Sequence, residues 1–190
     1  RLAELQSRIR PHFLFNALNT ALALVQVSPR QAEAVLEDLA QLFRVALAES
    51  GSAVTLDEEI DLAQRYLAIE QLRFGDRLQV VWDLDPAAAN AHMPPLVLQP
   101  LVENSIKHGL EPKVEGGTIT VRALRDGQRL TLQVSDTGVG FDSAAARADG
   151  FGLAQVRERL GTAYADQSAV EQSSIPGQGT TTLLHLPLTP

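Results

Sequence analysis

The sequence contains no cysteine, which excludes disulfide bonds and thiolate metal sites. It also lacks an apolar run near the roughly 20 residues that a membrane-spanning helix needs, and it shows no signal-peptide pattern. Acidic residues outnumber basic ones, and the net charge of −7 argues against nucleic acid as a partner, because such binding depends on phosphate contacts. With 45% hydrophobic residues, the 190-residue chain can nevertheless bury the core of one domain or of two small ones.

The start of the chain predicts a helix over residues 2–27. Its apolar side chains recur at helical spacing, and we expect the face that they form to turn toward the core; this face contains Pro11, Leu14, Phe15, Leu18, Leu22 and Val25. His12 and Asn16 lie one turn apart on a polar stripe nearly opposite that face. Pro11 predicts a local kink, because proline removes a backbone hydrogen bond inside a helix. His12 is therefore not expected among the core residues.

A second helix is predicted over residues 31–50, after a turn at Ser28-Pro29. Two apolar helices joined by a short turn form a hairpin. Each helix has too many apolar side chains for a lone hairpin in water. A homodimeric four-helix bundle would bury the surplus, so we expect a homodimer.

A third helix is predicted over residues 55–74. It begins with a capping-box pattern at Thr55–Glu58, in which the threonine and the glutamate satisfy each other's backbone N–H groups. It ends at the Gly75-Asp76 turn, where we place the domain boundary. Residues 1–75 then form a helical domain, and residues 76–190 form a second domain.

The second half of the chain mixes strand and helix patterns. Asp126-Gly127 between two alternating segments predicts a hairpin turn. The expected fold class is α+β, with the helical hairpin followed by an α/β sandwich. The predicted strands cover residues 78–84, 118–125, 129–136, 169–174 and 180–187, and the predicted helices cover residues 96–107 and 153–160.

Two segments of this half place polar residues and glycines together. In LVENSIKHG, the side chains of Asn104, Lys107 and His108 lie within about one helical turn. An asparagine oxygen suits a hard cation such as Mg²⁺, and a lysine can meet a phosphate. In SDTGVGF, a strand ends at Asp136, and Gly138 and Gly140 allow a flat ligand to approach the backbone closely.

Two further segments contain glycine before a helix or a strand. In DGFGL, Gly150 and Gly152 leave backbone N–H groups free at the start of a helix, which favours an anion. In GQGTTTLLHLP, Gly179 and Thr180 begin the last strand. Neither a Walker P-loop nor a Rossmann fingerprint is present.

In this order and spacing, the four segments resemble the nucleotide-binding sites of the GHKL superfamily, which includes gyrase, a heat-shock chaperone, histidine kinases and a mismatch-repair protein. The segment around Asn104 resembles the N box, residues 136–140 and 150–153 resemble the two glycine boxes, and Gly179-Thr180 resembles the final element. The run PHFLFN and the run YLAIEQLRFGDRL (Tyr66–Leu78) are similar to the LytS-like branch of sensor histidine kinases.

The resemblance implies that the second domain binds Mg-ATP. Asp136 would recognise the adenine amino group with Thr180 nearby, Asn104 would ligate Mg²⁺, and residues 141–150 would form a short lid. Lys107 and His108 would face the phosphates. The nucleotide contacts implied by the resemblance are Asn104, Lys107, His108, Asp136, Gly138, Gly140, Gly150, Gly152, Leu153 and Thr180.

The resemblance also implies a phosphoryl-transfer pathway. His12 would accept the γ-phosphoryl group of ATP, with Asn16 orienting its ring. His12 would then pass the group to an aspartate in the receiver domain of a response regulator. The expected setting is the cytoplasmic portion of a membrane-anchored sensor, with the membrane segment upstream of this chain.

Some positions depart from the pattern of related proteins. Phe13 stands where some kinase branches place an acidic base after the histidine, which leaves the base open. Pro100 stands where the ATPases of the superfamily place a catalytic glutamate, so ATP hydrolysis by water is not the expected main activity. Glu103 has two readings, one as a residue that orients a metal-bound water and one as a cap or ion-pair partner. No role is assigned to His92 or His185.

Overall fold

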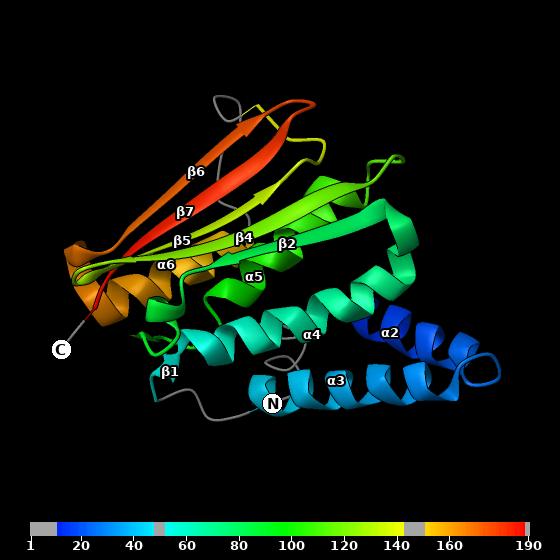
Figure 1. Cartoon of the computed structure of the whole chain (residues 1–190). Helices are drawn as coiled ribbons and strands as arrows, with labels where there is room; N and C mark the ends of the chain where they lie inside the picture. The colour runs from blue at the N-terminus through cyan, green and yellow to red at the C-terminus, as the bar shows by residue number, and fades with distance from the viewer. Residues whose placement is uncertain (1–10, 48–51, 143–150, 189–190) are drawn as a thin grey trace. The chain divides into compact units, whose positions relative to one another are not determined.

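The computed structural model describes residues 11–47, 52–142 and 151–188 (Figure 1). In chain order the principal elements are α2 (Pro11–Leu24), α3 (Pro29–Leu47), β1 (Val54–Thr55), α4 (Leu56–Phe74), β2 (Leu78–Leu84), β3 (His92–Met93), α5 (Leu98–Asn104), a π-helical turn (Ser105–Leu110), β4 (Gly117–Asp126), β5 (Arg129–Asp136), α6 (Phe151–Tyr164), β6 (Ala169–Ile175) and β7 (Gly179–Pro187).

The chain divides into two compact units. The first contains residues 1–51 and 61–76, and the second contains residues 52–60 and 77–190. Helix α4 therefore belongs to both units, because its first residues group with the second unit and the remainder with the first. Among the described helices, none is both long enough and apolar enough to cross a membrane.

In the first unit, α2 and α3 form the predicted hairpin. Helix α3 begins at Pro29, directly after Ser28, and proline suits the first helical position because its missing N–H would have no partner there. On α2 the buried residues are Ala17 and Ala21, one turn apart. Their small side chains allow α2 to pack closely in the unit. On α3 the buried residues are Ala32, Val35, Leu39, Leu42 and Ala46.

The predicted core face of α2 is wrong for the single chain. Phe15 and Leu22 are 64% and 70% exposed, and Leu18 and Val25 are exposed as well. The reason is that α2 packs through its alanines, so that the larger apolar side chains of the helix remain on the surface. The expected kink at Pro11 depends on residues 1–10, which lie outside the described residues, as does the predicted end of the second helix.

The start of α4 confirms the capping box. The backbone N–H of Glu58 donates to Thr55 Oγ1 at 3.2 Å, and the backbone N–H of Thr55 donates to Glu58 Oε2 at 2.8 Å. Each residue thus satisfies one backbone group of the other. In the first unit, Arg65 Nη1 of α4 donates to Asp38 Oδ1 of α3 at 2.8 Å, and Arg65 Nε donates to Asp61 Oδ2 at 2.8 Å.

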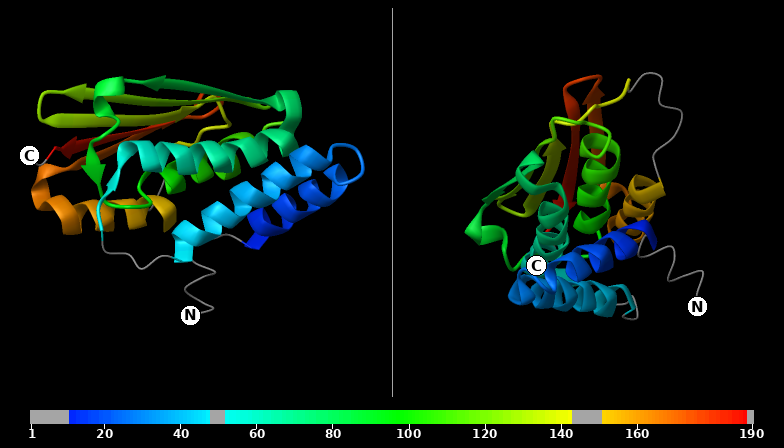
Figure 2. Two further views of the ribbon diagram at one scale, coloured as in Figure 1. Left: turned by 60° about the horizontal axis from the view of Figure 1, so that its bottom comes forward. Right: turned by 90° about the vertical axis from the view of Figure 1, so that its right-hand side faces the viewer.

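The second unit is a two-layer α/β sandwich. Its five-stranded sheet has the order β2-β4-β5-β7-β6, in which β2 runs parallel to β4 and the other neighbours are antiparallel. Helices α5 and α6 cover one face of this sheet (Figures 1 and 2). Strand β5 turns Leu130, Leu132 and Val134 into the core. This architecture confirms the expected fold class.

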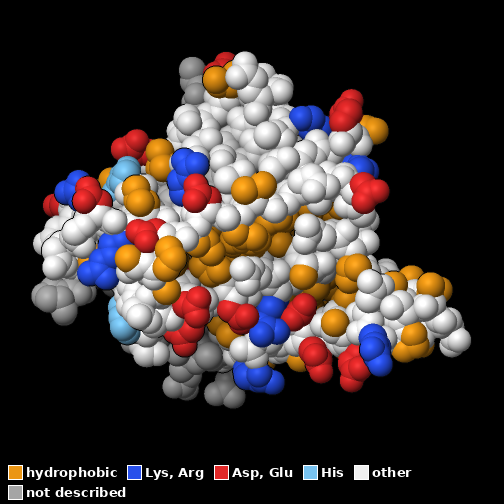
Figure 3. All heavy atoms as spheres, in the orientation of Figure 1, with side chains coloured by type: hydrophobic (Ala, Val, Ile, Leu, Met, Phe, Trp, Pro, Cys, Tyr) orange, Lys and Arg blue, Asp and Glu red, His pale blue; other side chains and the backbone are white. Residues whose placement is uncertain are grey.

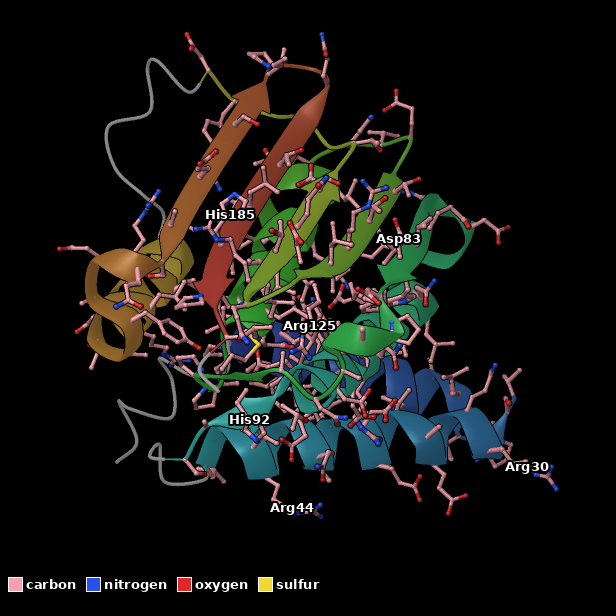
Figure 4. The ribbon with its side chains drawn as sticks, turned by 60° about the vertical axis from the view of Figure 1, so that its left-hand side comes forward. Arg30, Arg44, Asp83, His92, Arg125 and His185 are labelled. Carbon is pink, nitrogen blue, oxygen red and sulfur yellow. The ribbon has the colours of Figure 1, made fainter. Side chains whose placement is uncertain are left out.

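The opposite face of the sheet carries polar side chains that alternate with the buried ones. His185 Nδ1 on β7 lies 3.2 Å from Thr131 Oγ1 on β5. Arg122 Nε on β4 donates to Asp83 Oδ2 on β2 at 2.6 Å (Figure 4). His92 belongs to β3, which pairs with β1 in a small second sheet that the sequence pattern did not predict.

The predicted helix over residues 96–107 has different bounds in the structure. Helix α5 begins at Leu98, and Pro100 falls in its first turn, where a missing N–H does no harm. After Asn104 the chain widens into a π-helical turn that continues past Gly109 to Leu110. The predicted end at residue 107 is therefore three residues short of the last helical residue, Leu110.

Candidate functional site

Asp136, the last residue of β5, is a buried carboxylate with several hydrogen-bond donors around it. It is 8% exposed, and its Oδ1 accepts the backbone N–H of Gly138 at 2.9 Å. Burial raises the pKa of Asp136, while hydrogen bonds from Gly138, from the Ser105 side chain and from the Thr180 backbone, and the charge of Lys113, lower it. A carboxylate held in this way still has lone pairs to accept a further N–H from a ligand.

Four glycines pack closely around Asp136. A Cβ atom at Gly109 would lie 2.6 Å from Asp136 Oδ1, and one at Gly138 would lie 2.3 Å from the Cα of Gly109. Gly140 has a φ of +60°, and a Cβ atom there would lie 2.1 Å from the backbone oxygen of Ile175 in β6. Gly179 has a φ of +110°, and a Cβ atom there would lie 1.9 Å from the backbone oxygen of Asp136. No larger residue fits these positions without moving the backbone. The segment Thr137–Phe141, which we call the glycine loop, is thus held tightly against β5, β6 and the π-helical turn.

Where α5 passes into the π-helical turn, consecutive residues face different sides of the site. The wide spacing of this turn is shown by the hydrogen bond from Glu111 N to Ile106 O, at 2.8 Å over five residues. Ser105 is buried and bonds to Asp136, whereas its neighbour Asn104 lies beside α6. Gly109 O accepts the N–H of Val139 at 2.9 Å, which ties the turn to the glycine loop.

Asn104 and Gly152, two of the nucleotide contacts implied by the resemblance, lie side by side. A Cβ atom at Gly152 would lie 3.1 Å from Asn104 Nδ2, so the glycine leaves space beside the amide. Lys107 and His108 follow in the π-helical turn and are exposed. Leu153 is buried in the core at 1% exposure. The predicted contact at Gly150 lies outside the described residues.

Thr180 belongs to a small hydroxyl network next to Asp136, its partner residue on the neighbouring strand. Thr180 Oγ1 lies 2.8 Å from Ser174 Oγ, and Ser174 Oγ also accepts the N–H of Phe141 at 2.9 Å. Ser174 thereby connects the end of the glycine loop with the hairpin of β6 and β7.

His12 and Asn16 lie on α2, in the first unit. His12 is exposed, and Asn16 Nδ2 lies 3.4 Å from its Nδ1 and 3.5 Å from its Nε2. The next residue, Phe13, packs its ring against Tyr66 with the ring centroids 4.7 Å apart. The histidine ring is therefore accessible, and the residue after it is occupied with packing.

Sequence reasoning missed several residues that surround Asp136. Ser105 and Gly109 both lie within the segment LVENSIKHG, four residues apart, and both meet Asp136. Lys113 donates to the carbonyl oxygen of Thr137 at 2.5 Å, from a loop where a lysine is ordinarily solvated. None of these three positions carries a local sequence signal beyond its place near a motif.

Comparisons with known proteins agree with this arrangement. Residues 1–78 match the family described as "Histidine kinase", and residues 94–190 match the family described as "Histidine kinase-, DNA gyrase B-, and HSP90-like ATPase". The chain is 36% identical over 183 residues to the sensor histidine kinase BtsS of Escherichia coli, which covers 96% of this chain and 32% of BtsS. It is 34% identical over 198 residues to the sensor protein LytS of Staphylococcus haemolyticus, which covers 98% of this chain and 34% of LytS.

The chain thus spans about a third of the length of these relatives. Among solved structures, the histidine kinase domain of a blue-light activated histidine kinase from Erythrobacter litoralis has the same fold, with a TM-score of 0.56 and 17% identity, over 98% of this chain and 90% of that one. With an ATPase-family match over residues 94–190 and LytS among its relatives, this chain belongs to the histidine kinase-, DNA gyrase B- and HSP90-like ATPase family and, within it, to the LytS-like sensor histidine kinases.

Proposed function

We propose that this chain is the kinase core of a two-component sensor, which transfers the γ-phosphoryl group of ATP to His12 and then to an aspartate of a response regulator. The observation that carries the proposal is the combination of an exposed histidine on α2 with a buried Asp136 inside a tight glycine loop. A histidine alone is usually structural. A nucleotide-type site in the same chain gives it a phosphoryl donor.

The base of the nucleotide is recognised at Asp136 in this proposal. Its carboxylate accepts a hydrogen bond from the exocyclic amino group of adenine, as it already accepts one from Gly138. Because Gly109, Gly138 and Gly179 have no side chains, backbone segments pack closely around it. Thr180, with its hydroxyl bonded to Ser174, lies on the strand next to Asp136.

Magnesium is expected at the phosphates. Asn104 supplies a side-chain oxygen, and Gly152 leaves space beside it at the first turn of α6. Mg²⁺ often takes only one or two protein ligands and completes its shell with water and substrate phosphates, so a single asparagine fits this ion. The ion neutralises phosphate charge when bound. Lys107 and His108 follow on the exposed side of the π-helical turn and add positive charge and N–H donors.

The reaction at His12 is a displacement at phosphorus. A neutral ring nitrogen forms the new P–N bond, the bond between the γ-phosphorus and the bridging oxygen breaks, and ADP leaves. Asn16, one turn away, is close enough to orient the ring. The residue next to His12 is not the base, because Phe13 has no proton acceptor and packs on Tyr66. In the second transfer the P–N bond breaks as an aspartate oxygen of the receiver domain forms a P–O bond.

A homodimer is part of the proposal. Several apolar residues of α2 remain exposed on the helical hairpin. The hairpin also has a hollow of about 490 Å³. Its lining consists of Val25, Pro29, Ala32, Glu33, Leu36, Glu37 and Ala40. Figure 3 shows hydrophobic side chains at the surface over this hairpin. A second copy of the hairpin would cover them in a four-helix bundle. The setting that we propose is the cytoplasmic side of a membrane-anchored sensor, since its relatives are named as sensors.

Autophosphorylation with labelled ATP tests the central proposal. We expect wild-type protein with Mg²⁺ to acquire an acid-labile phosphate and to pass it to a receiver domain. His12→Gln removes the acceptor nitrogen but, at an exposed position, leaves the fold intact, so labelling should disappear while nucleotide binding persists. Labelling of His12→Gln at the wild-type level would contradict the assignment of the acceptor.

The matched control is Asn19→Gln. Asn19 is an exposed residue two turns further along α2, and we expect its variant to label as the wild type does. Steady release of phosphate from ATP by the wild type, without labelled protein, would favour an ATPase in place of a kinase.

A further inference from the structure

Glu59 is a buried carboxylate near the start of α4, in the second unit. It is 3% exposed, and it accepts three backbone N–H groups where α5 begins. Oε1 accepts from Leu96 at 2.6 Å, and Oε2 accepts from Val97 at 2.9 Å and from Leu98 at 2.8 Å. The first N–H groups of a helix have no partner inside the helix, and the N-cap residue Val97 provides no side-chain cap. Glu59 therefore caps α5 from a different helix.

The same segment is held from its carbonyl side by α6. Arg159 Nη1 donates to Pro95 O at 2.9 Å and to Leu96 O at 2.8 Å. Between these contacts Leu96 has a φ of +57°, a left-handed conformation that is unfavourable for leucine. Strained backbone persists only where its surroundings hold it in place, and here Glu59 and Arg159 do so from the two sides of the chain. We call residues 95–98 with these two side chains the α5 clamp.

The α5 clamp and the nucleotide site lie at opposite ends of the same two helices. Leu96 meets Arg159 of α6 at one end, and Asn104 meets Gly152 of α6 at the other. Helix α5 has seven residues, so it is a rod about 10 Å long that connects the clamp to Asn104. A shift in its first turn is passed on to Asn104, because so short a helix has little room to bend.

Two acceptor oxygens make this cap specific for a glutamate. Burial raises the pKa of Glu59, and the three N–H bonds together with the positive charge of Arg159 lower it. A glutamine has nearly the same shape but replaces one acceptor oxygen by an NH₂ donor, which then faces a backbone donor. The segment at residues 96–98 loses at least one of its bonds in that variant, while the packing volume is kept.

We propose that Glu59 is a positioning residue of the nucleotide site, which acts through α5 to hold Asn104 where it meets the metal-bound phosphates. The inference rests on the proposed function, in which Asn104 is the ligand to Mg²⁺. It also makes α4 part of the support of the nucleotide site, and α4 is the helix that continues into the histidine-bearing unit. Asp136 itself is fixed by β5, which pairs with β4 and β7, so Glu59 acts mainly on the metal-dependent part of binding.

The test is a titration of the whole chain with the ATP analogue AMPPNP, once with Mg²⁺ and once with EDTA. For Glu59→Gln we expect affinity with Mg²⁺ to fall about tenfold, as for other residues that orient a metal ligand, and affinity with EDTA to stay unchanged. The matched control is Asp57→Asn, an exposed acidic residue two positions earlier on α4, which should bind as the wild type does in both titrations.

A double-mutant cycle adds a readout that a general loss of stability would not produce. Asn104→Ala should show the same loss with Mg²⁺ only, and adding Glu59→Gln to Asn104→Ala should weaken binding no further, since the glutamate acts through the asparagine. If circular dichroism shows that Glu59→Gln is unfolded, Arg159→Gln tests the same clamp from its carbonyl side, with the same expected pattern.

Three outcomes would overturn the inference. Wild-type affinity in Glu59→Gln removes the positioning role, and equal losses with Mg²⁺ and with EDTA would show a general effect on the fold. Full additivity in the double-mutant cycle would separate Glu59 from Asn104. A wild-type chain that binds no AMPPNP under either condition overturns the proposed function itself, which distinguishes that failure from a failure of the inference alone.

Discussion

The two candidate functional regions of this chain are built in opposite ways. His12 lies on the surface of α2 and has a neighbour in Asn16, whereas Asp136 is buried and surrounded by glycines that tolerate no Cβ atom. A phosphoryl acceptor has to reach a donor and later a receiver, so exposure serves it. A binding carboxylate has to keep a fixed geometry, so tight packing serves it. Substitutions at the first region should therefore change activity alone, and substitutions at the second should change stability as well.

The largest effect is expected for Gly138→Ala, which would break the packed region. The new Cβ atom would lie 2.3 Å from the Cα of Gly109, which is backbone and cannot turn away. We expect a free energy of unfolding that is lower by about 3 kcal/mol, as in other cases of overpacking, together with loss of nucleotide binding. Thermal or denaturant unfolding and an AMPPNP titration measure the two effects.

Gly161→Ala is the matched control for this variant. Gly161 lies in the exposed part of α6, and nothing lies within 4 Å of the position that its Cβ would take. Alanine is favoured over glycine inside a helix by about 1 kcal/mol or slightly less, so this variant should be more stable than the wild type. A similar stability in Gly138→Ala and Gly161→Ala would mean that the glycine loop is not packed as described.

The second prediction separates binding from stability at Asp136. Because burial raises the pKa of Asp136, its carboxyl group binds a proton more tightly in the folded protein than in the unfolded chain. The charged carboxylate at neutral pH therefore lowers the stability of the fold. Asp136→Asn removes this charge but also places an NH₂ donor where a carboxylate oxygen accepted, so we expect a smaller change in the free energy of unfolding than for Gly138→Ala. Its nucleotide affinity at neutral pH should nevertheless fall roughly ten- to a hundredfold, because a charged acceptor is lost.

The pH dependence sharpens this prediction. In the wild type, affinity for AMPPNP should decrease as the pH falls through the raised pKa of Asp136, since protonation removes the charged acceptor. In Asp136→Asn this part of the pH profile should be flat. Titrations from neutral pH downward toward the ordinary pKa of a carboxyl group measure both profiles, and identical profiles would argue against Asp136 as the group that contacts the base.

The smallest effect on the single chain is expected for Leu22→Lys, on the exposed face of α2. Leu22 is 70% exposed, so the lysine should leave the stability of the monomer nearly unchanged. If that face pairs with a second copy, the charge will separate the dimer. Light scattering coupled to size-exclusion chromatography distinguishes the two states. Val81→Lys, at an exposed apolar position on β2, should remain dimeric, and a dimeric Leu22→Lys would place the interface elsewhere.

Elements with a strong local signal could be predicted from the sequence. Strands β2 and β5 have the predicted bounds, because each alternates regularly and ends at a turn. The capping box of Thr55 and Glu58 fixes the start of α4, since it depends only on residues three apart.

Features that depend on contacts between distant segments could not be predicted. The π-helical turn, in which Ser105 and Gly109 meet Asp136, is one of them, because the sequence alone favours an ordinary helix there. Glu59 meets residues almost forty positions later in the chain, so nothing near it reveals that it is buried. The exposed face of α2 was assigned to the core because apolar spacing shows which side chains share a face, but not which partner covers it.

The π-helical turn also has a consequence for protein engineering and for sequence comparison. A π-helical turn contains one residue more than an α-helical turn of the same rise, so residues 105–110 are out of phase with the helix before them. A chimera that replaces this segment with a regular helix would rotate every following side chain by about 100°. Any graft of this nucleotide site must therefore carry the extra residue along, even where an alignment makes it look like a neutral insertion.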